Sequence, residues 1–225
     1  MRICSLKKES EKLRKYQRLE DYDLDAEIIQ QQDEDTEKQF QSWLRFYRKV
    51  FNLEFEDATE IVIPPRLPGF SWLIVVPRYV DLRGVLEACK ERFEVEVKFY
   101  SDIASAVVAN TRSNKNRGYA VWIRHRQITD DRLLGLSVQE LEDIGANTMT
   151  LLERLLAELK FYTETGRHLD QTKLTLCAGT RLEGDYFPTV AWMRRPGYMK
   201  IGNIGYTGAK HFIAAREVVD NPVTA

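Results

Sequence analysis

Leu174-Thr-Leu-Cys-Ala-Gly-Thr-Arg181 opens the stretch of this 225-residue chain that decides its fold. Three further runs follow it, in the order Tyr186-Phe-Pro-Thr-Val-Ala-Trp192, Tyr198-Met-Lys-Ile-Gly-Asn-Ile204 and His211-Phe-Ile-Ala-Ala-Arg-Glu-Val-Val219. Each run is short and either apolar or alternating, and Gly, Pro and Asp lie between the runs. This pattern predicts a meander of short strands over residues 174–219.

Large polar and aromatic side chains occupy many of the remaining positions in this meander. None of their spacings matches a catalytic motif or a phosphate-binding loop. We therefore predict a ligand-binding surface on a protein that is not an enzyme and needs no cofactor. The residues predicted to contact the ligand are Arg194, Arg195, Tyr198, Lys200, Asn203, Tyr206, Lys210 and His211.

The overall composition is that of a globular protein, with 44% hydrophobic and 30% charged residues. A formal net charge of −1 argues against a global basic field for nucleic acid. No apolar run approaches the roughly 20 residues of a membrane span, and the first residues lack the apolar core of a secretory signal. We expect a cytoplasmic protein that does not enter membranes, with non-standard export left open.

Cysteine and histidine spacing gives no metal-site or disulfide pattern. The cysteines are Cys4, Cys89 and Cys177, and the histidines are His125, His168 and His211. We expect incidental or buried thiols and hydrogen-bonding or surface histidines, with no bound metal. A Cys177–His168 nucleophile and base couple is disfavoured, because the apolar surroundings of Cys177 favour its neutral thiol.

Residues 1–50 form a charged segment with two predicted helices, one between Leu6 and Leu19 and one over residues 36–50. The second carries an apolar stripe at helical spacing, made of Phe40, Trp43, Leu44, Tyr47 and Val50. We expect this stripe to pack on the following domain, and self-association through it is the alternative.

Residues 51–225 are predicted to form one α+β domain that begins with a small mixed α/β layer over residues 55–126. Within this layer we expect strands at 71–76, 93–100 and 119–124, and helices at 81–92 and 101–108. The first helix has Asp81 as its N-cap.

A Leu-rich core helix follows the layer. A capping box at Ser137 predicts the start of one helix, either Thr150 or Asn147 is expected to cap the next, and Gly145 and Gly166 predict the two ends. Leucines at helical spacing between 151 and 162 form the apolar stripe of the second helix. Its solvated face is expected to hold Glu153, Arg154, Glu158 and Lys160.

A basic loop supports a second function class, a nucleic-acid-associated accessory protein. The loop over residues 111–126 would act together with the basic and aromatic tail to bind a phosphate backbone. Its basic residues are Arg112, Lys115, Arg117, Arg124 and Arg126. Strongly salt-dependent binding to single-stranded nucleic acid distinguishes this function from ligand binding by the tail alone.

The last seventy residues resemble a family of mostly hypothetical proteins of uncultivated bacteria and phages. The residues that carry the resemblance are Thr165-Gly-Arg-His-Leu-Asp170, Leu176-Cys-Ala-Gly-Thr-Arg181, Pro188-x-Val190-x-Trp192, Met199-Lys-Ile201 and Ile213-Ala-Ala-Arg216-Glu-Val-Val219. The tail is similar to the variable region of target proteins of diversity-generating retroelements, in which a reverse transcriptase rewrites adenine-containing codons.

The resemblance implies a C-type lectin-like fold in the C-terminal β region. It also implies a diversified surface that binds a macromolecular ligand, expected to be a protein. The chain lacks the Glu-Pro-Asn and Trp-Asn-Asp triplets of calcium-dependent lectins, so calcium and sugar binding are not implied.

Overall fold

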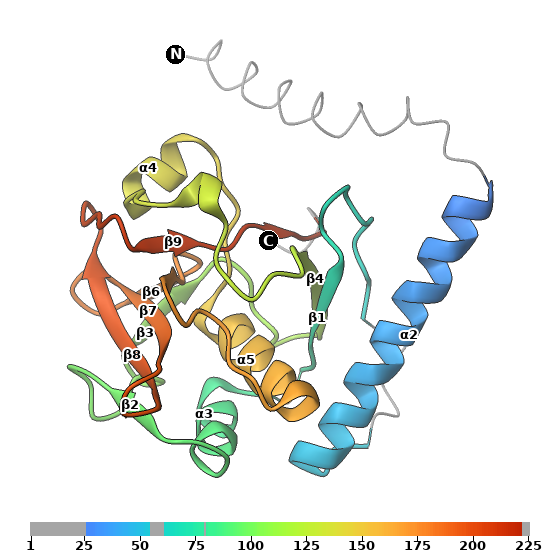
Figure 1. Cartoon of the computed structure of the whole chain (residues 1–225), viewed down its shortest axis with the longest axis horizontal. Coiled ribbons are helices and arrows are strands. Elements are labelled where there is room, and N and C mark those ends of the chain that lie inside the picture. The colour runs from blue at the N-terminus through green and yellow to red at the C-terminus, as the bar shows by residue number, and fades with distance from the viewer. Residues whose placement is uncertain (1–25, 55–60, 79, 222–225) are drawn as a thin grey trace. The chain divides into compact units, whose positions relative to one another are not determined.

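A computed structural model describes residues 26–54, 61–78 and 80–221, with side chains from residue 33 onward (Figure 1). The chain divides into two compact units, residues 1–39 and 40–225, and each is described by itself. Helix α2 (Ala26–Phe51) includes the helix expected over residues 36–50 and begins ten residues earlier. The helix expected between Leu6 and Leu19 lies outside the described residues.

The described residues between 40 and 221 form two β-sheets, and together with the helices they confirm the α+β class. The three-stranded sheet has the order β1 (Trp72–Val76), β4 (Tyr119–Ile123) and β10 (Val218–Val219). The main path of the seven-stranded sheet is β2 (Val95–Val97), β8 (Tyr198–Gly205), β7 (Tyr186–Met193), β5 (Leu174–Leu176) and β9 (Ile213–Ala215). Strand β6 (Thr180–Leu182) joins β7 to β3 (Val107–Asn110).

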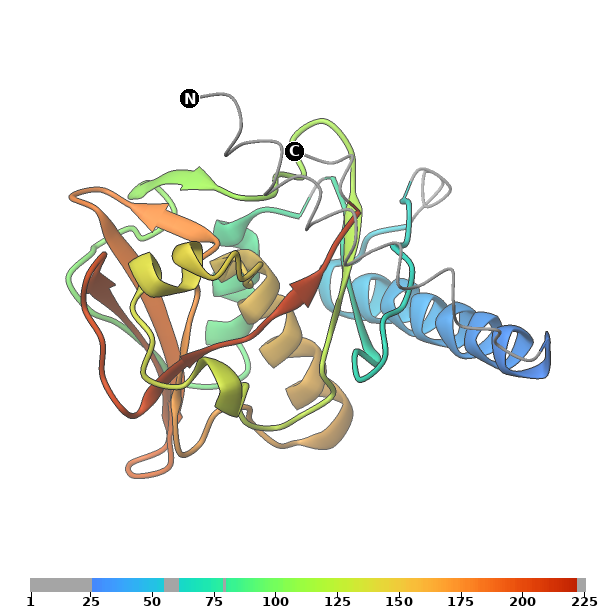
Figure 2. The ribbon, with the colours of Figure 1, turned by 90° about the horizontal axis from the view of Figure 1, so that it is seen from above.

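Helix α5 (Leu151–Thr165) lies between the two sheets, as Figures 1 and 2 show. It begins at the capping box of Thr150 and ends at Gly166, which adopts the left-handed φ of 65° that favours glycine. Helix α3 (Leu82–Lys90) packs against it, with Asp81 as the predicted N-cap. The leucines of α5 share one core with both sheets, so the layer over residues 55–126 and the C-terminal strands fold as one unit.

The two faces of the seven-stranded sheet have different neighbours. Val190, Met199 and Ile201 point into the main core beneath α5. Phe187 and Ile204 lie on the opposite face, in a second apolar cluster. That cluster is covered by α4 (Val138–Asp143), which starts at the predicted Ser137 capping box, and by the turn η2 (Asp131–Leu133).

The aromatic stripe at the end of α2 packs on the domain that follows it, as predicted, through its two buried members. Trp43 and Tyr47 are fully buried, and both hydrogen-bond to β1, at the edge of its sheet. The Trp43 indole donates to the Leu73 carbonyl over 2.6 Å, and the Tyr47 hydroxyl donates to the Val75 carbonyl over 2.5 Å. The stripe therefore protects a sheet edge, and these two side chains are not available to a second copy of the chain.

Tyr47→Phe is expected to lower the free energy of unfolding by about 1–3 kcal/mol, because the buried Val75 carbonyl loses its hydroxyl donor. Urea unfolding measures the change. Tyr100→Phe is the matched control, since the contacts of the Tyr100 hydroxyl among the described residues are long, 3.4 Å to the Glu183 carbonyl and 3.5 Å to the Asn203 amide, and neither is fully buried. Equal stability losses in the two variants would contradict the edge-protecting role of Tyr47.

One predicted helix is wrong. Residues 101–106 form a turn, in which the Asp102 carboxylate accepts hydrogen bonds from the backbone of Ala104 and Ser105. Residues 107–110 then form β3, which pairs with β6. Asp102 caps this turn as it would cap a helix, and Val107 and Val108 favour the strand that follows.

Candidate ligand-binding surface

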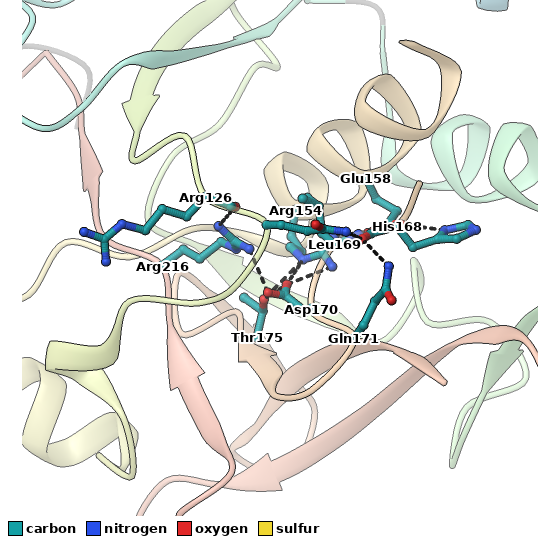
Figure 3. A network of polar contacts seen from close by, with 10 residues as sticks. Arg126, Arg154, Glu158, His168, Leu169, Asp170, Gln171, Thr175 and Arg216 are labelled. Atoms are coloured by element: carbon teal, nitrogen blue, oxygen red, sulfur yellow. Dashed lines mark hydrogen bonds and ion pairs between the residues drawn. The ribbon is translucent and has the colours of Figure 1, made fainter. Parts of the chain in front are cut away.

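A buried ionic network lies behind the C-terminal strands (Figure 3). Asp170 is its centre: one carboxylate oxygen accepts from Arg216 over 2.7 Å, and the other accepts from Arg154 over 2.9 Å and from Thr175. Arg154 also pairs with Glu158 over 2.8 Å. The network ties α5 to β5 and to the segment that follows β9.

The expectation of a solvated face on α5 is wrong. Glu153, Arg154, Glu158 and Lys160 are all buried, with exposed fractions of 3% or less. Two of their ion pairs, Arg154–Glu158 and Lys160–Glu164, lie within α5. Other partners come from outside the helix: Arg112 for Glu153, Asp170 for Arg154 and Ser42 for Lys160. Burial therefore leaves the charges paired and not isolated. The polar side of α5 therefore faces a second layer of structure instead of water.

His168 occupies a site beside this network, at 8% exposure. Its Nδ1 lies 2.9 Å from Glu158 Oε1, and its ring stacks between Trp192 and Tyr162. The predicted hydrogen-bonding histidine is thus confirmed for His168. Burial raises the pKa of Cys177 to about 12, which keeps that thiol protonated and unsuited to act as a nucleophile.

Two arginines of the basic loop are engaged inside the protein. Arg112 is 4% exposed and pairs through two nitrogens with Glu153, over 2.7 and 3.0 Å. Arg124 pairs with Asp130 and Glu217 over 3.1 and 2.9 Å. Lys115, Arg117 and Arg126 are exposed. The loop therefore offers fewer free cations to a phosphate backbone than its sequence indicates.

The eight predicted ligand contacts all retain exposed surface, but they do not form a single patch. Four lie near the β7–β8 turn and are here called the hairpin surface: Arg194, Arg195, Tyr198 and Lys200. Glu96 of the neighbouring strand lies opposite Lys200. A hydrogen bond from the Lys98 ammonium holds the pKa of Glu96 below its usual value, and Tyr198 and Lys200 contribute to this shift.

The other four predicted contacts lie toward the far end of β8, and its ends are roughly 23 Å apart at about 3.3 Å per residue. Asn203 is on the face opposite Lys200, where its amide lies 3.5 Å from the Tyr100 hydroxyl. The β8–β9 connection carries the remaining three, here called the loop surface: Tyr206, Lys210 and His211. The Tyr206 hydroxyl donates to Glu142 over 2.6 Å, which fixes this loop against α4.

Two further residues at these surfaces were missed. Phe99 has a left-handed φ of 72° and a 79% exposed side chain, and it precedes Tyr100. Arg167 follows α5 and is bridged to the hairpin turn through two glutamines. Sequence spacing gives no signal for either, because a positive φ and a contact between distant loops are both consequences of the folded arrangement.

The described residues contain no group of three His, Cys, Asp or Glu side chains arranged to hold a metal ion. Within the same residues, no helix has the length and apolar character needed to cross a membrane. Comparisons with protein-family models, with curated proteins and with solved structures found no match.

Proposed function

We propose that this chain is a non-enzymatic ligand-binding protein that displays variable side chains on a C-type lectin-like scaffold. By the resemblance of its last seventy residues, it would be a target protein of a diversity-generating retroelement. Its ligand is a macromolecule, and we expect a protein. The hairpin surface and the loop surface are the two places where that ligand would be contacted.

The observation that carries the proposal is that buried and exposed side chains alternate in the first half of β8. Met199 and Ile201 are fully buried in the core, whereas Tyr198 and Lys200 beside them keep exposed surface. Exposed positions tolerate substitution within about 0.5 kcal/mol, and buried ones do not. A strand built in this way can change its outward residues while the fold stays the same.

Sequencing the 3′ end of the gene across its source population tests the proposal. Within residues 186–212, substitutions are expected to concentrate at the codons whose side chains are exposed, including those of Tyr198, Lys200 and Tyr206. The codons of Met199 and Ile201, within the same stretch, are expected to stay constant. Variation spread evenly along the gene would remove the support for a diversified surface.

In a variant with all four residues of the hairpin surface changed to alanine, the free energy of unfolding is expected to stay within about 1 kcal/mol of the wild-type value. The reason is that none of these side chains is buried in the core. Tyr and Arg are common anchors in binding surfaces, so the same variant is expected to lose ligand binding. Urea unfolding checks the first result and a ligand titration the second. Unfolding of the variant under native conditions would show that these residues belong to the scaffold.

A further inference from the structure

The geometry points to a carboxylate-binding site formed by Arg167 and Arg194, here called the arginine pair, for an acidic segment of a protein ligand. Arg194 belongs to the hairpin surface, and Arg167 extends that surface beyond the predicted residues. The inference deepens the proposed function and rests on it, because it names the chemistry of the ligand at one of the two surfaces.

Two glutamines hold the arginine pair in place. Gln127 donates from its side-chain amide to the His168 carbonyl over 2.8 Å and accepts from Arg167 over 2.9 Å. Gln171 donates to the same carbonyl over 3.0 Å and accepts from the Nε–H of Arg194 over 2.8 Å. Each guanidinium is therefore one amide group away from the same backbone oxygen.

A glutamine orients an arginine without neutralising it. No ion pair links Arg167, Arg194 or Arg195 to a carboxylate among the residues that the structure describes. By contrast, the exposed arginines Arg83 and Arg181 each pair with an aspartate. The arginine pair thus combines fixed geometry with full positive charge and exposed side chains, the combination that suits bidentate binding of carboxylates.

The scaffold behind the arginine pair is buried and densely paired. The His168 carbonyl belongs to the residue whose ring stacks between Trp192 and Tyr162. His168 is followed by Leu169 and Asp170, which are fully buried, and Asp170 is anchored by Arg154 and Arg216. Preorganised donors of this kind lose little conformational entropy on binding.

The surroundings favour an acidic protein segment over nucleic acid. Single-stranded nucleic acid needs aromatic faces that are free to stack on bases. Here the His168 ring already stacks on Trp192 at 3.3 Å and on Tyr162 at 4.6 Å between centroids. A phosphate backbone also needs a continuous basic track, and Arg112 and Arg124 are paired internally.

The test uses the full-length chain and a fluorescein-labelled peptide in which eight glutamates alternate with serines. Binding is measured by anisotropy at low salt, beside a peptide with glutamine in place of glutamate and a single-stranded oligodeoxynucleotide of equal charge. Arg167→Gln and Arg194→Gln are each expected to weaken binding of the acidic peptide about five-fold, the effect of removing one partly screened charge pair.

Gln171→Glu keeps the side-chain shape and adds a carboxylate beside Arg194, and it also removes the amide donor to the His168 carbonyl. It is expected to weaken peptide binding at least as much as Arg194→Gln, since it neutralises that arginine and loosens the group that positions it. Arg117→Gln removes the same charge from an exposed loop and is expected to leave binding within about two-fold. Urea unfolding of each variant separates loss of the site from loss of the fold.

Failure to bind the acidic peptide would overturn the inference, as would equal losses in Arg117→Gln and in the arginine-pair variants. Tighter binding of the oligonucleotide through the same two arginines would also overturn it and would assign the site to phosphate. These outcomes are distinct from failure of the proposed function, which is judged by where the gene varies. If the protein binds the acidic peptide but its gene varies evenly, the carboxylate-binding site is supported and the diversified surface is not.

Discussion

Asp170→Asn is expected to lower the free energy of unfolding by about 3–5 kcal/mol, the usual cost of removing one partner of a buried ion pair. The substitution keeps the shape of the side chain and removes the charge that neutralises Arg154 and Arg216. Both guanidinium groups stay buried, and their other described acceptors are Glu158 and Thr175 for Arg154 and the Arg126 carbonyl for Arg216. Urea unfolding at neutral pH measures the loss.

The pH dependence gives this prediction a second readout. Burial alone would raise the pKa of Asp170, but Arg216 and Arg154 more than offset it, so the pKa lies below its ordinary value of 3.8. The stability that this carboxylate contributes is therefore fully present above pH 3.8 and is lost as the pH falls through the lower native pKa. The difference between wild type and Asp170→Asn is expected to shrink in that acid range.

Asp185→Asn is the matched control. Asp185 pairs with Arg181 over 3.5 Å at the surface, and both side chains are largely exposed. Removing that charge is expected to change the free energy of unfolding by less than about 0.5 kcal/mol. If Asp170→Asn costs no more than Asp185→Asn, the network does not hold α5 to the C-terminal strands.

Arg112→Met is the second large effect, at about 3–5 kcal/mol of lost stability. Within the described part of the chain, Arg112 makes five hydrogen bonds, two to Glu153 and one each to Asn147, Thr148 and Asp220. Its removal leaves the fully buried Glu153 carboxylate without its cation. Urea unfolding measures the loss, and Arg117→Met in the same loop is expected to stay near wild type because Arg117 is exposed.

A double substitution tests the cause. Glu153→Gln added to Arg112→Met is expected to recover part of the stability, since it removes the uncompensated charge and keeps amide groups for Tyr119 and Thr150. No recovery would mean that the loss in Arg112→Met comes from packing and the other hydrogen bonds. Because Arg112 is buried, any loss of nucleic-acid binding in Arg112→Met would be a consequence of its lower stability and not of a lost phosphate contact.

Helix ends were predictable because their signals are local. Ser137 and Gly166 act through backbone groups within a few residues of themselves, and the structure places each at the predicted cap. Of the two candidates for the start of α5, Thr150 and Asn147, the cap is Thr150. Alternation describes only the first half of β8, where Tyr198 and Lys200 keep exposed surface between the buried Met199 and Ile201, and it breaks at Asn203 and Ile204. The turn over residues 101–106 was misread because an Asp cap serves a turn as well as a helix.

The buried charges of α5 were not predictable from spacing. A polar residue opposite a leucine stripe is normally solvated, and only a partner elsewhere in the chain reverses that rule. For Arg154 the partner Asp170 lies sixteen residues away, and for Arg112 the partner Glu153 lies forty-one residues away. Neither pairing leaves a periodic trace in the sequence.

The sequence by itself determined the α+β class and the helix caps at Asp81, Ser137 and Gly166, because propensity and capping act over a few residues. The tertiary structure alone decided that the eight predicted contacts separate into distinct surfaces, since strand register sends Lys200 and Asn203 to opposite faces. It also brought Arg167 and Arg194 to glutamines that share one carbonyl, because three loops distant in sequence meet beside His168.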